Sequence, residues 1–147
     1  MENAGQRLAQ AINNYRGFDP AQAAEQAARE ARIDAPPTGP DGRPATTTAA
    51  SMDPTMPLKP GNPYNTQIGY SGEVPAGTVG LPGPVAERLP VESWEHWSVD
   101  NCAEVASVSR VVTAGSSIDD VITRTVRTGN GNVWPACENC SRWLPNR

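Results

Sequence analysis

The sequence predicts an α/β fold in the C-terminal part of the chain, preceded by a helical hairpin and a disordered linker. Three consecutive signals carry this prediction: a helix with apolar spacing over residues 103–112, a β-branched strand over 121–127, and a short helix after Pro135. This order of elements predicts an α/β unit, with a right-handed crossover where its strands are parallel. The chain therefore divides into a helical N-terminal segment (1–34), a linker (35–63) and a C-terminal domain (64–147).

The N-terminal segment is predicted to be helical from its apolar spacing and its start signals. Asp19 is a good N-cap, and Pro20 suits the first helical position. Alanine, glutamine and charged residues dominate, so little apolar surface is available for packing. We therefore expect a solvated spacer that needs a partner to be stable.

The segment 35–63 is rich in proline, glycine, threonine and alanine, and it offers almost nothing to bury. We expect a disordered linker, with Met52 and Met56 exposed. Beyond it, two short apolar pieces at 68–70 and 78–81 are separated by turn residues. They predict a hairpin of two weak strands, and Pro75 and Pro82 favour edges or loops.

Composition narrows the possible functions. The net charge of −4 argues against a protein that clamps duplex nucleic acid mainly through phosphate contacts, although arginines are concentrated beyond Asp120. The chain has three cysteines, and an odd number excludes a complete disulfide framework. No apolar run approaches the length of a membrane span, and the N-terminus does not resemble a secretory signal.

The cysteines fall at the starts of the two C-terminal helices. Asp100 is the expected N-cap of the first helix and Gly115 its expected stop. Cys102 lies in the first turn, where backbone N–H groups and the helix dipole stabilise a thiolate. A C-x-x-C pair, Cys137 and Cys140, opens the second helix and lets both sulfurs face one metal ion.

Three cysteine ligands would leave the fourth position of a zinc ion for water, which is the mark of a catalytic site. Such a water ionises near neutral pH. Glu104 lies two residues after Cys102. At that offset its carboxylate can lean over the metal without ligating it and act as general base and general acid.

The stretches "NCAEVASVSRVVTAGSSIDD" and "PACENCSRWL" resemble the zinc nucleobase and nucleoside deaminases. The signature of that superfamily is a His or Cys, then x-E, then P-C-x-x-C, with the glutamate as proton shuttle. The flanking residues look like the YwqJ-like branch of the bacterial polymorphic-toxin deaminases. The resemblance covers about residues 64–147 and is clear from 94 to 144.

The resemblance implies a cytidine deaminase-like α/β/α sandwich that holds Zn²⁺ on Cys102, Cys137 and Cys140, with Glu104 moving protons. The implied reaction is hydrolytic deamination of a nucleobase, with cytosine in nucleic acid as the expected target. It also implies that the domain is the C-terminal part of a secreted or delivered bacterial effector that acts in the cytoplasm of the target cell. A cognate immunity protein and a nucleic acid or nucleotide substrate are the implied partners.

The sequence departs from the family pattern in two places. Ala136 separates Pro135 from Cys137, whereas the usual form is P-C-x-x-C. The chain also ends soon after Cys140, where the family fold continues with further strands and a helix. We therefore expect a sandwich shortened at its C-terminus. Either the shortened sheet suffices, or its exposed edge is covered by the N-terminal segment or by another copy of the chain.

Other interpretations remain open. His96 is the only histidine and could complete a closed structural Cys₃His zinc site. A redox Cys137–Cys140 pair is less well supported, because no thioredoxin-like pattern precedes it. The N-terminal part could instead make the chain a partner-binding module without catalysis.

Four residues near the cysteines are candidates for substrate binding. Trp97 or Trp134 could stack on a base, and His96 could line the pocket. Asn101 could hydrogen-bond a base or cap a helix. Burial of the tryptophans in a small core is the simpler explanation.

Overall fold

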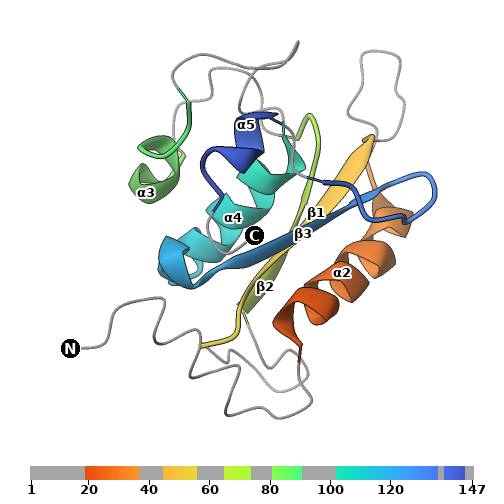
Figure 1. Ribbon diagram of the computed structural model, residues 1–147, viewed down its shortest axis with the longest axis horizontal. Coiled ribbons are helices and arrows are strands. Elements are labelled where there is room, and N and C mark those ends of the chain that lie inside the picture. Colours follow the sequence, from red (N-terminus) through yellow and green to blue (C-terminus); the bar gives the residue numbers. More distant parts are fainter. Residues whose placement is uncertain are drawn as a thin grey trace.

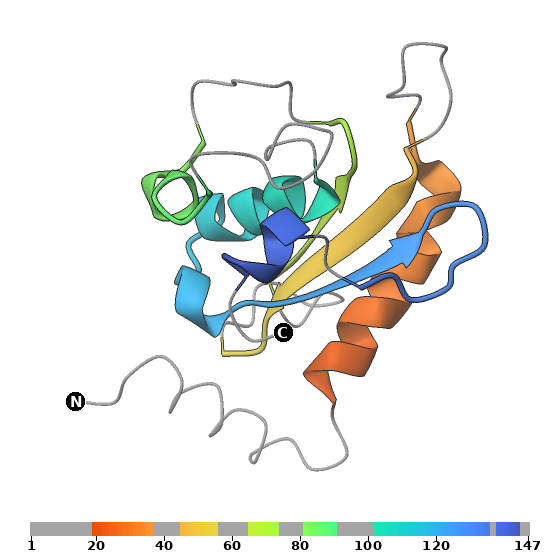
Figure 2. The same ribbon diagram turned by 45° about the horizontal axis from the view of Figure 1, so that its top comes forward.

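A helix lies on each face of a three-stranded antiparallel sheet in the computed structural model (Figure 1). Helix α2 (Pro20–Ala31) packs on one face, and α4 (Ala103–Thr113) packs on the other together with the short α5 (Glu138–Ser141) (Figure 2). The prediction of an α/β fold is confirmed at this level. The structure describes residues 19–36, 45–55, 65–73, 81–90, 102–135 and 138–144.

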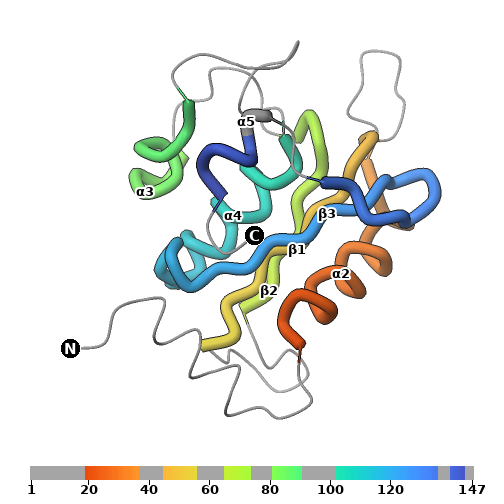
Figure 3. The backbone as a smooth tube through the Cα atoms, viewed as in Figure 1, coloured from red at the N-terminus to blue at the C-terminus, as the bar shows by residue number. Residues whose placement is uncertain are grey.

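The sheet has the strand order β2-β1-β3, with β1 (Thr47–Asp53) in the centre. Ala50 is paired with Ile68 of β2 (Asn65–Tyr70) on one side and with Arg124 of β3 (Ile122–Arg127) on the other, both antiparallel. Each pair of neighbouring strands in this sheet is therefore antiparallel. Helix α4 does join two strands that run in the same direction, but β1 lies between them (Figure 3).

The central strand lies within the segment that was expected to be a disordered linker, so that expectation is wrong for Thr47–Asp53. The strand is polar, but its buried hydroxyls are paired. Ser51 Oγ lies 2.8 Å from Ser107 Oγ and 2.8 Å from Thr123 Oγ1. Buried polar groups are tolerated when they are hydrogen-bonded. Met52, expected to be exposed, is only 3 % exposed, and Met56 lies outside the described residues.

Helix α2 begins as predicted, because the Asp19 carboxylate accepts hydrogen bonds from two backbone amides of the first turn. It is not a solvated spacer. Ala24 and Ala28 are fully buried and form a small core with Ala50 and Val126 of the sheet. The remaining part of the predicted N-terminal hairpin, residues 1–18, lies outside the described residues.

Helix α4 carries the larger core. Val105, Val108 and Val111 are fully buried against a cluster that also includes Trp143. The chain leaves the helix at Gly115, whose φ of 114° suits glycine, as predicted. The N-cap is Cys102 rather than Asp100.

The remaining elements are a short α-helix and two single helical turns. The helix α3 (Gly83–Ala86) packs on the larger core through Val85, and the turns are η1 (Arg32–Asp34) and η3 (Ile118–Asp120). The sequence predicted that residues 68–70 pair with residues 78–81 in a hairpin. In the structure β2, which contains residues 68–70, pairs with β1, and residues 78–80 lie outside the described ranges.

The outer edge of β3 is partly covered by the segment that leads towards α5. The Arg127 amide donates to the Asn132 carbonyl at 2.8 Å, and the Trp134 amide donates to the Thr125 carbonyl at 2.9 Å. Helix α2 packs on one face of the sheet, mainly against β3 and β1. No helix in the described ranges is long and apolar enough to cross a membrane.

Candidate metal centre

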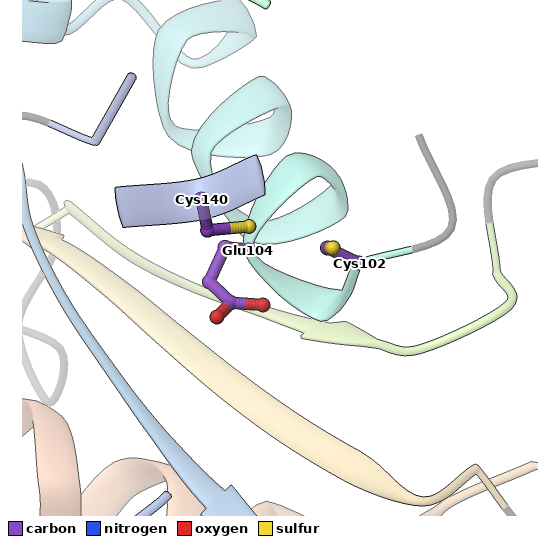
Figure 4. Close-up of side chains that lie close together, drawn as sticks. All are labelled: Cys102, Glu104 and Cys140. Carbon is purple, nitrogen blue, oxygen red and sulfur yellow. The ribbon is translucent and has the colours of Figure 1, made fainter. Parts of the chain in front are cut away.

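Cys102, Glu104 and Cys140 come together on the α4 face of the sheet. The two sulfurs and a carboxylate oxygen all lie within 4.8 Å of one another. The three side chains point towards a common point between the start of α4 and α5 (Figure 4). They are 7 %, 5 % and 0 % exposed, respectively, so the group is shielded from solvent.

The start of α4 is held close to the sheet by two features. Gly69 of β2 lies so near the helix that a Cβ at this position would be 2.4 Å from the Ala103 carbonyl oxygen. One turn on, the Ser107 hydroxyl donates to the Glu104 carbonyl at 3.3 Å and joins the buried hydroxyls of Ser51 and Thr123. The backbone that carries Cys102 and Glu104 is therefore fixed relative to the sheet.

Cys140 is brought to this point by packing rather than by sequence proximity. It lies in the same buried cluster as Cys102, Trp143 and Leu144. The Leu144 amide donates to the Cys140 carbonyl at 3.0 Å, which closes a helical turn. Helix α5 is too short to be stable alone, so this apolar cluster determines where the Cys140 sulfur lies.

The donor set fits a zinc ion. Both described cysteines are thiols rather than halves of a disulfide. Tetrahedral zinc with Zn–S bonds of about 2.3 Å separates two sulfurs by about 3.8 Å, which the observed spacing accommodates. Soft thiolate ligands select zinc over the hard cations magnesium and calcium. The first turn of α4 also favours negative charge on Cys102 and Glu104 through the helix dipole.

The structure brings together two of the three predicted zinc ligands and the predicted proton shuttle. Four predicted site residues, Cys137, His96, Trp97 and Asn101, lie outside the described residues. Trp134 is described and is 44 % exposed, with the Arg127 guanidinium 4.5 Å from its ring centroid.

Two contributors to the site were missed in the sequence. One is the chain of buried hydroxyls on Ser51, Ser107 and Thr123, which no local pattern identifies because the residues are far apart in sequence. The other is Gly69. An isolated glycine in a strand often marks the close approach of another backbone, so its position was an available signal.

Cys102, Glu104 and Cys140 therefore form a buried group that could hold a metal ion and place a carboxylate beside it. Comparison of the chain with protein-family models, with curated proteins and with solved structures finds no match.

Proposed function

We propose that this chain is a zinc-dependent deaminase that removes the amino group of a nucleobase, with cytosine in nucleic acid as the expected target. The observation that carries the proposal is that Cys140 meets Cys102 and Glu104, although it lies far from both in the sequence. The arrangement of a helix on each face of the sheet agrees with the sandwich that the family resemblance implies.

Cys102 and Cys140 would hold the zinc ion together with Cys137, which lies three residues before Cys140 in the sequence. When bound, zinc supplies a Lewis acid that brings the pKa of a water molecule close to neutral. The Glu104 carboxylate would accept a proton from water at an Oε atom while the water oxygen bonds to the amino-bearing ring carbon. It would then return the proton to the amino nitrogen, which leaves as ammonia when the C–N bond breaks. The buried surroundings exclude bulk water from this exchange.

As a bacterial toxin domain, the chain would act in the cytoplasm of a target cell and would be neutralised by a cognate immunity protein. This biological setting depends on the resemblance of the motifs alone. It is tested by expressing the chain in bacteria with and without a candidate neighbouring gene product and by sequencing the genome and transcripts.

A structural zinc site is the second candidate, and burial favours it. All three described donors are at most 7 % exposed, and a closed structural site has no open position for water. In that case Glu104 would serve as a ligand or as a buried acid, and His96 could be a further ligand.

The Glu104→Gln variant separates the two candidates. For a deaminase, zinc content measured by mass spectrometry is retained, and deamination of cytidine and of cytosine-containing RNA and DNA falls by about 10²–10⁴-fold. Glu87→Gln is the matched control, because Glu87 is exposed. Loss of zinc from the Glu104 variant, or undiminished activity, would contradict the shuttle role.

A further inference from the structure

A hollow of about 570 Å³ lies where β3 ends, between the turn after that strand and the turn η1. Its polar lining includes Arg32 of η1, Thr46 before β1, Arg127 at the end of β3 and Asn130 in the turn that follows. The exposed side chain of Ile33, which is 80 % accessible, also lines it. The hollow therefore joins segments from the N-terminal and C-terminal parts of the chain.

The side chains that line this hollow carry a net positive charge. The described residues that line it include two arginines and no carboxylate. Over the described ranges, neither Arg32 nor Arg127 forms an ion pair with a carboxylate. Other described arginines do form such pairs: Arg29, Arg88, Arg110 and Arg124. The hollow is therefore complementary to an anion.

Both guanidinium groups are held in place by uncharged partners. Arg32 donates from Nη1 to the Thr128 carbonyl at 2.9 Å. Its side chain crosses Gly131, where φ is +75° and a Cβ would lie 2.9 Å from Arg32 Nε. Arg127 stacks on Trp134 at 4.5 Å. These contacts restrain the side chains and leave their charges available to a ligand, which lowers the entropic cost of binding.

The hollow lies at the same end of the sheet as the Cys102, Glu104 and Cys140 group. Arg127, at the end of β3, pairs with Thr47 at the start of β1, and Thr48 pairs with the last residue of β2. The contact of Gly69 with Ala103 places the start of α4 at this same end.

We propose that the hollow binds the phosphate backbone of a single-stranded nucleic acid and holds the strand as substrate for the metal centre. The inference rests on the proposed function, because it assigns the form of the substrate. Two fixed arginines match phosphate oxygens. The half-exposed Trp134 and exposed Ile33 flank them with apolar surface, and single-strand binding sites combine backbone cations with aromatic side chains that stack on bases.

The test measures the fluorescence anisotropy of a labelled cytosine-containing RNA about 12 nucleotides long, a length within the range that small domains bind. With the full chain, Arg127→Gln is expected to weaken binding about tenfold, as for a lost hydrogen bond to a charged group. The slope of log K against log salt should fall by about 0.7, the value for one phosphate contact on a single strand. Arg127→Lys should keep most of that slope.

Arg88→Gln is the matched control, because Arg88 is exposed and paired with Asp119 on another part of the surface. Arg32→Lys, checked for folding by circular dichroism, provides a second variant in the hollow. Unchanged affinity and salt slope in the Arg127 and Arg32 variants would overturn the inference. If cytidine monophosphate competes as strongly as the unlabelled oligonucleotide, the hollow binds a single nucleotide, and the inference that it binds a strand is overturned. Arginine-dependent RNA binding without deamination by the parent protein would instead refute the proposed function.

Discussion

Replacing Gly69 with alanine would insert a methyl group between β2 and the first turns of α4. A Cβ at this position would lie 2.4 Å from the Ala103 carbonyl oxygen and 2.4 Å from the Ser107 amide nitrogen. Both are backbone atoms, so no side-chain rotation can relieve the overlap. Either the helix must move away from the sheet, or the strand must bend.

The size of the displacement follows from these distances. Ordinary van der Waals contact begins at 3.4 Å, so the helix and strand must separate by about 1 Å. Overpacking of this kind costs about 1–3 kcal/mol, and we expect the upper end because the atoms belong to backbone. The same shift would move Cys102 and Glu104 relative to Cys140. A misplacement of about 1 Å costs on the order of 10²-fold in rate.

The assay is thermal unfolding of Gly69→Ala, with zinc content and deamination measured on the same samples. A loss of about 3 kcal/mol should lower the melting temperature by roughly 6–12 °C in a chain of this size. Gly83→Ala is the matched control, because a Cβ there has no heavy atom within 4 Å. Equal melting temperatures and equal zinc contents for the two variants would show that α4 is not held against β2 in this way.

Two further predictions concern polar side chains of the sheet. Ser51→Ala removes the hydroxyl that links Ser107 and Thr123, and it should lower the free energy of unfolding by about 1–3 kcal/mol in urea titrations. Ser51→Thr keeps a hydroxyl, so it tests whether the loss of stability comes from the lost hydrogen bonds rather than from the changed shape of the side chain. Burial, followed by the nearby carboxylates, raises the pKa of Tyr70 above its usual value of 10.0, and its hydroxyl donates to the Ala31 carbonyl at 2.8 Å. Folding therefore favours the neutral phenol, and the stabilisation that this gives the folded protein is present below pH 10.0 and is lost as the pH rises through the pKa of the folded state. The free energy of unfolding should fall less steeply at alkaline pH in Tyr70→Phe than in the parent protein. An equal fall in both proteins would contradict a raised pKa of Tyr70.

Local sequence signals predicted the elements whose stabilising features are themselves local. The cap formed by Asp19, the apolar spacing of α4 and the β-branched residues of β3 all act within a few positions along the chain. The same reasoning failed for β1. Its sequence, TTAASMD, is polar and lacks the large apolar residues that usually mark a buried strand.

The candidate site divides in the same way. The offset between Cys102 and Glu104 is a local property of the first turn of α4, so the sequence by itself determined that a thiol and a carboxylate would lie together. Only the tertiary structure decided that Cys140 joins them, that the polar segment Thr47–Asp53 becomes the central strand, and that α2 covers the sheet. The physical reason is that these outcomes depend on partners distant in sequence: Ser51 can be buried only because hydroxyls of Ser107 and Thr123 meet it, and α5 is placed by the core that it completes.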